Sequence, residues 1–306
     1  MTLSGIVKTS LVVLLVGAGV AMYPPARLSA LVLAGRSPEC PLANAVRADQ
    51  NLQDQIASKD RILKASKMIA KDEHFEQWET PMGTYWITKE SRYVLPYNLA
   101  EQDRKIYGEG SNFVRPGDIV LDCGANIGVF VKASLDAGAK KVIAIEPAPE
   151  NLEALRRNFK SEIESGRVVI YPKGVWDKDD FLTMNIDHGN SAADSFVIHP
   201  EHSSATTEKL PLTTIDKLVA ELGLERVDFI KMDIEGAEVR ALHGGAATIA
   251  KYHPRMSLSV YHEPDHPVEV PKAVRAAWSG YRMECGPCAF EKENKRIRPD
   301  IVYFHE

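Results

Sequence analysis

The second half of the chain alternates short apolar runs with amphipathic segments. The run IVLDCG, which ends at Gly124, is followed by the helical stretch GVFVKASLDAG, and KVIAIEP is followed by PENLEALRRNF. Further apolar runs are RVVIYPKGVW, VDFIKMD and RMSLSVY, FLTMNID reads as an inserted strand, and YRMECG and IVYFHE close the chain. Because repeated strand–helix units build parallel sheets, we predict an α/β fold with a doubly wound, mostly parallel sheet over residues 118–306.

The amino end has a different pattern, in which one apolar run is followed by polar sequence. Residues 11–22, LVVLLVGAGVAM, carry no charge but are shorter than the ~20 residues that span a bilayer comfortably. We interpret residues 1–36 as a membrane anchor or signal-like segment, and the run alone leaves its cleavage open. Arg27, Arg36 and Arg47 follow the run, which favours a retained anchor with a cytoplasmic catalytic domain.

Two shorter regions connect this segment to the strand–helix units. In residues 37–75, Leu52, Ile56 and the apolar residues after them recur at roughly helical spacing, which predicts a polar helical stalk that lies on the catalytic domain. Residues 76–117 contain the alternating stretch GTYWITKESRYVLP. We therefore predict a cap formed by a hairpin over residues 84–95 and a helix.

Composition narrows the class of partner and the compartment. The chain has 306 residues, 37 basic and 42 acidic, and no stretch combines basic residues with aromatics as a nucleic-acid groove would. Nucleic acid is therefore not expected as a partner.

Cys40 is isolated, Cys123 lies inside the glycine turn, and only Cys285 and Cys288 are close together, so we expect no disulfide framework and a reducing compartment.

The glycine turn after the first of these strands indicates the kind of ligand. Gly124 and Gly128 are four residues apart with Asn126 between them, whereas a dinucleotide turn needs a glycine at that middle position to admit the pyrophosphate. Asp122 suits a ligand with an ammonium group, and Glu146 ends the next strand, where it can accept hydrogen bonds from ribose hydroxyls. A ligand with a ribose, an amine and no phosphate is S-adenosylmethionine.

Three stretches resemble successive signatures of the FkbM family of methyltransferases: VLDCGANIGVF, VIAIEPAPENLEALRRNF and VDFIKMDIEGAEVRALHGG. The resemblance covers roughly residues 101–262. It implies a seven-stranded sheet with the last strand antiparallel, S-adenosylmethionine as methyl donor, and usually a hydroxyl as acceptor. The cofactor positions of the family fall on Asp122, Gly124, Ala125, Asn126, Gly128 and Glu146, and the residues that flank the adenine fall on Val175 and Trp176.

The candidate catalytic residues follow the later strands. Lys231, Asp233 and Glu235 lie in KMDIEG, and His262 follows RMSLSVY. Methyl transfer to a hydroxyl needs a base, and with an unperturbed pKa of ~6.5 His262 suits that role, with Asp233 or Glu235 orienting it. The alternatives are that Asp233 binds the amino group of the cofactor, that Lys231 only pairs with Glu235, or that Asp233, His262 and His266 bind a divalent metal; we assign no metal to the site.

Two further motifs have the spacing of known sites without the required local structure. HEPDH, residues 262–266, matches a zinc-protease pattern, but that pattern needs both histidines on one helix, and Pro264 and Pro267 oppose a regular helix. CGPC, residues 285–288, matches a redox dithiol but precedes no amphipathic helix, so we expect two ordinary thiols.

We therefore predict a membrane-anchored methyltransferase that transfers a methyl group in line from S-adenosylmethionine to a hydroxyl on a small molecule, glycan or lipid. Its donor is made in the cytosol, which also favours a cytoplasmic catalytic domain. Two alternatives remain at this point. One is a nicotinamide-dependent oxidoreductase on a similar sheet, which the missing middle glycine disfavours. The other is a non-catalytic, membrane-anchored binding module.

Overall fold

The computed structural model describes residues 23–198, 205–292 and 294–306, so the apolar run at residues 11–22 lies outside the described residues. Of the predicted segment 1–36, the described part contains the ten-residue helix α2 (Pro24–Leu33). Among the helices of the three described ranges, none combines the length and the apolar character that crossing a membrane requires. The anchor therefore stays a prediction.

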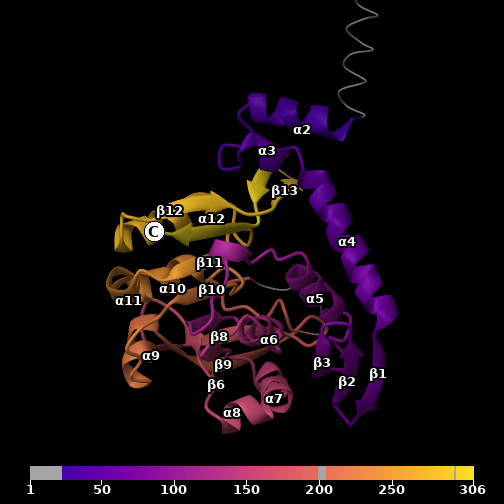
Figure 1. Ribbon diagram of the computed structural model, residues 1–306, viewed down its shortest axis with the longest axis vertical. Helices are drawn as coiled ribbons and strands as arrows, with labels where there is room; N and C mark the ends of the chain where they lie inside the picture. Colours follow the sequence, from indigo (N-terminus) through magenta and orange to yellow (C-terminus); the bar gives the residue numbers. More distant parts are fainter. Residues whose placement is uncertain (1–22, 199–204, 293) are drawn as a thin grey trace, which may run out of the picture.

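A seven-stranded sheet forms the centre of the molecule (Figure 1). Its strand order is β12-β15-β11-β10-β4-β5-β6. All neighbouring pairs from β11 to β6 are parallel, and β15 runs antiparallel to both β11 and β12. The prediction of a mostly parallel sheet whose last strand is antiparallel is confirmed. The strands are β4 (Ile119–Cys123), β5 (Lys141–Ile145), β6 (Val168–Tyr171), β10 (Phe229–Met232), β11 (Arg255–Ser259), β12 (Arg282–Cys285) and β15 (Ile301–His305).

Helices cover both faces of this sheet, which explains why its strands are continuously apolar. Successive residues of a strand point to opposite faces. Leu121 accordingly packs in one apolar cluster, with α9 to α12, whereas Val120 packs in another, with α6 and α7. The helices are α6 (Val129–Asp136), α7 (Pro149–Asn158), α8 (Lys160–Glu164), α9 (Ile215–Glu221), α10 (Glu238–Gly244), α11 (Ala246–Tyr252) and α12 (His266–Ala277).

The strand order reverses at β4, and this reversal creates the position for a ligand. From β4 the chain continues to β5 and β6 on one side, and it later returns to β10 and β11 on the other side. In the register of β4 and β10, Asp122 lies beside Lys231 and Cys123 beside Met232. The loops that leave the carboxyl ends of these strands are therefore neighbours, which is where open parallel sheets bind ligands.

Two smaller sheets lie outside the central one. β7 (Gly174–Val175), β8 (Asp180–Asp187) and β9 (Ala205–Thr213) form a three-stranded sheet, in which β8 is the predicted inserted strand. β13 (Cys288–Glu291) and β14 (Arg296–Pro299) form a hairpin near the carboxyl end.

The region before the central sheet differs in detail from the prediction. The short helix α3 (Leu42–Ala45) precedes α4 (Ala48–Ala65), which packs against α5 (Leu95–Asp103) and β13. The buried residues of α4 are Ala48, Ser58 and Ile62, whereas Leu52 is 50% exposed, so the apolar spacing indicated the helix but not its packed face. The hairpin lies earlier than residues 84–95, because β1 (Lys67–Lys71), β2 (Phe75–Thr80) and β3 (Gly83–Thr88) form an antiparallel sheet.

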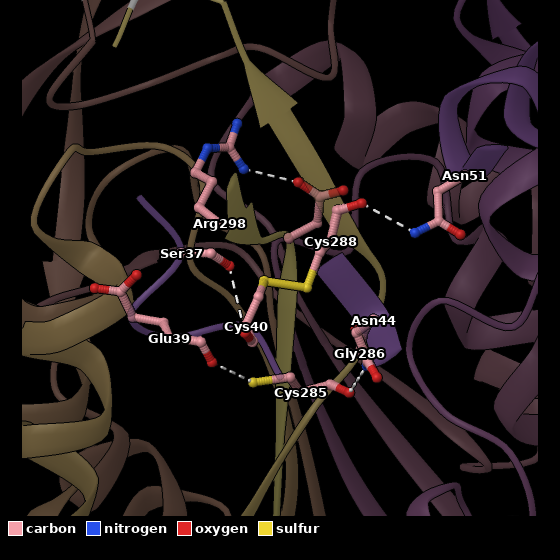
Figure 2. The surroundings of a disulfide bond; sticks show 10 residues. Ser37, Glu39, Cys40, Asn44, Asn51, Cys285, Gly286, Cys288 and Arg298 are labelled. Atoms are coloured by element: carbon pink, nitrogen blue, oxygen red, sulfur yellow. Dashed lines mark hydrogen bonds and ion pairs between the residues drawn. A yellow bond between two sulfur atoms is a disulfide. The ribbon is translucent and has the colours of Figure 1, made fainter. Parts of the chain in front are cut away.

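The cysteines contradict the prediction of no disulfide. Cys40 and Cys288 form a disulfide across 248 residues of sequence (Figure 2). Two asparagines reinforce this contact: the Nδ2 atom of Asn44 donates to the carbonyls of Cys285 and Gly286, and that of Asn51 donates to the carbonyl of Cys288. The prediction failed because α2, α3 and α4 fold back onto the β13–β14 hairpin, which local spacing does not reveal. The disulfide also removes the argument for a reducing compartment that was based on the cysteines.

We expect Cys40→Ser to lower the free energy of unfolding of the oxidised protein by about 2–5 kcal/mol, because a cross-link over a long loop restricts the unfolded chain. Denaturant unfolding of the full-length protein in detergent, with and without reductant, measures this difference. The matched control is Cys285→Ser, because Cys285 is a free thiol at the end of β12, just before Cys288 in the sequence. Equal losses in both variants, or a peptide cross-linked through Cys285 in non-reducing mass spectrometry, would contradict the assigned pairing.

Candidate functional site

The turn after β4 has the backbone conformation that its sequence suggested. Gly124, Asn126 and Gly128 have φ values of +78°, +49° and +94°. A side chain on Gly124 would place its Cβ atom 1.9 Å from the carbonyl oxygen of Asp233. Gly124 is therefore required because the loops after β4 and β10 touch each other through their backbones.

Gly128 has a different role from the one predicted. Its Cβ position would lie 2.1 Å from the ring of Phe159, and the residue caps the amino end of α6. The missing side chain thus makes room for Phe159 of the core and not for a ligand. A larger residue at this position would change packing, so it is unsuited to a test of ligand binding.

The carboxylate of Glu146 links the glycine turn to the end of β5 through hydrogen bonds. Its Oε2 atom accepts from the backbone N–H of Asn126 at 2.8 Å, and its Oε1 atom accepts from the N–H of Ala148 at 2.9 Å and from Asn151 Nδ2 at 3.4 Å. Burial raises the pKa of this carboxyl, although these donors oppose the shift. Three donors leave one acceptor position of the carboxylate free for a ligand hydroxyl.

A pocket opens beside Glu146, between the ends of β5, β7 and β10. Gly124, Asn126 and Val175 line it, whereas Ala125 faces a second pocket described below and Trp176 lines neither. Trp176 instead stacks with Arg240, whose guanidinium carbon lies 5.6 Å from the centroid of the indole ring. Lining residues also come from the β8–β9 connection, and the sequence analysis missed them: Ser191, Ala192, Asp194 and Phe196.

Asp194 brings an acceptor into this first pocket. Its Oδ1 atom accepts from the backbone N–H of Asp187 at 2.7 Å, while its Oδ2 atom is buried without a hydrogen-bond partner among the described residues. Burial raises the pKa of Asp194 to about 8. No signal in the sequence singled out Asp194, because its chain segment reaches the pocket only through the fold of β8 and β9.

Asp122 and Lys231 form a buried ion pair beneath the site. Lys231 Nζ lies 3.3 Å from Asp122 Oδ1 and donates to the carbonyl of Gly124 at 2.8 Å. The side chain of Asp122 is 0% exposed and lines neither pocket, so the prediction that it faces a ligand ammonium is wrong. Lys231 pairs with Asp122 and not with Glu235, which corrects the alternative considered for it.

A second pocket adjoins the first and is rich in carboxylates. It shares Gly124, Asn126, Asp233 and Glu235 with the first pocket. Its other side is formed by α5 and the segment after it, and the lining residues from this side are Asn98, Glu101, Gln102 and Tyr107.

Glu101 of α5 is a carboxylate of this pocket that the sequence analysis missed. Burial, together with the nearby carboxylates of Asp233 and Glu235, raises the pKa of Glu101 to about 8. A carboxyl with such a pKa can accept a proton near neutral pH better than an ordinary glutamate. α5 was expected only as part of a cap, so its acidic residue was given no role.

His262 lies in the core of the site and does not reach a pocket. Its Nδ1 atom lies 2.9 Å from Glu238, and its Nε2 atom lies 3.3 Å from Asp233 and 3.2 Å from Glu235. Although burial lowers the pKa of His262, Glu238 and Glu235 raise it well above 6.5. His262 lines neither pocket, so its role as the base stays a prediction that the two pockets do not support.

The predicted metal set is also rearranged. The Nδ1 atom of His266 lies 3.3 Å from Oε2 of Glu238, on the other side of that carboxylate from His262. The ligand-type atoms that converge in the described part of the chain belong to Asp233, Glu238 and His262. Glu238, the first residue of α10, was not among the candidates of the sequence analysis.

Comparison with known proteins connects this geometry to one family. The family model described as the methyltransferase FkbM domain matches residues 122–283, more than half of the chain. The 31-O-demethyl-FK506 methyltransferase FkbM of Streptomyces tacrolimicus is 28% identical over 157 residues, which cover 43% of this chain and 60% of that protein. The 2-O-methyltransferase NoeI of Sinorhizobium fredii is 27% identical over 155 residues, covering 45% and 61%.

Among solved structures, the methyltransferase FkbM from Methylobacillus flagellatus KT is 17% identical, with a TM-score of 0.46 and coverage of 86% of this chain and 60% of that chain. The matched part of this chain spans about 60% of the length of the two relatives from Streptomyces tacrolimicus and Sinorhizobium fredii. The family match favours methyl transfer over the nicotinamide-dependent alternative.

Proposed function

This chain belongs to the FkbM family of methyltransferases, and from that premise we propose that it transfers a methyl group from S-adenosylmethionine to a hydroxyl. The observation that carries the proposal is the pair of adjoining pockets at the carboxyl ends of β4 and β10. The first has the features that a nucleoside needs, and the second has the carboxylates that an acceptor hydroxyl needs.

In this proposal the first pocket binds the adenosine of the donor. The free acceptor position of Glu146 receives a ribose hydroxyl, and Val175 and Phe196 supply apolar contacts to the adenine. The unpartnered Oδ2 atom of Asp194 is suited to accept from the exocyclic amine of the base. The methionine part then extends past Gly124 towards Asp233 and Glu235, whose negative charges complement its ammonium and sulfonium groups.

The second pocket binds the acceptor hydroxyl in the line of methyl transfer. Glu101 takes the hydroxyl proton, the oxygen forms a bond to the methyl carbon, and the carbon–sulfur bond breaks with its electron pair returning to sulfur. The sulfonium becomes a neutral thioether, so no further reactant is required. Lys231, Asp233 and Tyr107 position this pocket, and Tyr107 donates to Asp233 through its hydroxyl.

The acceptor class follows from the relatives, whose names specify transfer to oxygen. We propose a hydroxyl of a small molecule, glycan or lipid. These are the same acceptor classes that the sequence analysis considered.

We expect Glu146→Gln and Glu146→Ala to weaken S-adenosylmethionine binding at least tenfold, or ~1.4 kcal/mol, because the carboxylate both accepts from the ribose and orders the glycine turn. Calorimetry on the full-length protein in detergent measures the affinity, and thermal unfolding verifies that the variants are folded. Glu150→Gln is the matched control, since Glu150 lies in the first turn of α7 and pairs with His188 outside the pocket. Unchanged affinity in both Glu146 variants would refute the cofactor assignment.

We expect Glu101→Gln to lower turnover by about 10²-fold, because the amide keeps the shape of the side chain but cannot take up the proton. The affinity for S-adenosylmethionine should change by less than about threefold, because Glu101 lines the second pocket and not the first, which binds the donor. The assay follows labelled methyl groups from the donor into a metabolite extract. Asp103→Asn serves as control, because Asp103 lies on α5 but pairs with Ser58 and Arg61. A fully active Glu101→Gln protein would exclude this base.

The localisation is a separate proposal. We propose that residues 11–22 stay attached as an anchor and that the catalytic domain faces the cytoplasm, where the donor is made. Protease added to intact cells should then leave the domain uncut, and the mature chain should retain its first residues. The opposite result, digestion of the domain in intact cells, would agree with the oxidising compartment in which disulfides usually form.

A further inference from the structure

A cluster of metal-ligand side chains lies at the carboxyl ends of β10 and β11. One ligand atom each from Asp233, Glu238 and His262 lies within 4.8 Å of the others. Glu235 adds a further carboxylate, because its Oε1 atom is 3.2 Å from His262 Nε2. The proposed methyl transfer assigns no chemistry to this histidine, so its burial among three carboxylates calls for an explanation.

Glu238 fixes the orientation of the imidazole. Its carboxylate is itself held by the backbone N–H groups of Ile234 and Gly236, at 2.9 and 3.1 Å. Its Oε1 atom lies 2.9 Å from Nδ1 of His262. A carboxylate that holds one ring nitrogen of a histidine is the usual support behind a metal ligand, because it leaves the other nitrogen to face the ion.

The other ring nitrogen faces two carboxylates without a hydrogen bond to them. The side chain of His262 is 3% exposed, and its Nε2 atom is buried with no hydrogen-bond partner in the described ranges. It lies 3.3 Å from Asp233 Oδ1 and 3.2 Å from Glu235 Oε1. Ligands about 2.1 Å from one octahedral ion lie roughly 3 Å apart, so each carboxylate oxygen lies at about the separation from Nε2 that neighbouring ligands of a cation have.

We propose that Asp233, Glu235 and Nε2 of His262 bind a divalent cation, with Glu238 orienting the histidine. A set of carboxylate oxygens with one imidazole suits an ion such as Mn²⁺. Asp233 and Glu235 also line both pockets, so the ion would be open to a ligand from either side.

The role of the ion rests on the proposed function. The cation would coordinate the acceptor hydroxyl and increase its acidity, so that Glu101 removes the proton more readily before the oxygen attacks the methyl carbon. This differs from the metal set considered from the sequence, because His266 contacts the far oxygen of Glu238 and takes no part.

The test is the binding of Mn²⁺ to the full-length protein after treatment with a chelator and dialysis. Electron paramagnetic resonance should detect one saturable Mn²⁺ per chain, and electron spin echo modulation should contain the coupling of a directly bound nitrogen. We expect Asp233→Asn and Glu235→Gln to weaken this binding at least tenfold and His262→Gln to remove the nitrogen coupling. Asp265→Asn, an exposed acid between the two histidines, should bind Mn²⁺ as the unmodified protein does.

Each result has a defined meaning. Absence of saturable Mn²⁺ binding, or binding that Asp233→Asn and Glu235→Gln leave unchanged, overturns the site. If His262→Gln does not fold, which thermal unfolding detects, the two carboxylate variants decide alone. Calorimetry with S-adenosylmethionine on the metal-free protein separates the two proposals: retained donor binding without Mn²⁺ binding rejects only the metal site, whereas lost donor binding rejects the proposed function.

Discussion

The site depends on the way in which β4 and β10 are held together where the strand order reverses. The buried pair of Asp122 and Lys231 links the two strands, and Lys231 also donates to the carbonyl of Gly124. Burial raises the pKa of Asp122 to about 6, although Lys231 opposes the shift. Loss of either partner would leave an uncompensated charge in the core, typically a penalty of about 3–5 kcal/mol. The position of both loops, and hence of both pockets, follows from this pair.

A second consequence of the architecture is a concentration of negative charge. Glu101, Asp233, Glu235 and Glu238 gather within one region, where the ammonium of Lys231 and the imidazole of His262 also lie. Carboxylates this close favour any positive group that enters, since it relieves their mutual repulsion. A sulfonium donor and a divalent cation both meet that requirement. The same carboxylates thus attract both the donor and the ion.

The sequence predicted the parts of the molecule that depend on local pattern. Apolar runs such as IVLDCG identified the parallel strands, and Gly124, Asn126, Glu146 and Val175 do meet at one pocket. It failed where a side chain's surroundings come from distant segments. Asp122 proved to be sealed beneath the site, and His262 proved to be enclosed by α10, whose Glu238 gave no signal. Asp194 and Glu101 reach the pockets through elements whose placement no local pattern records.

The disulfide between Cys40 and Cys288 gives the molecule a path for mechanical force. A pull on the amino end of the chain would pass through α2 to Cys40 and then, across the sulfur bond, to the β13–β14 hairpin. The covalent shortcut bypasses α4, β1 to β3 and the glycine turn, all of which lie between the two cysteines in sequence. If residues 11–22 anchor the protein in a membrane, a force on the anchor would therefore reach the β13–β14 hairpin without passing along the strands that carry the pockets.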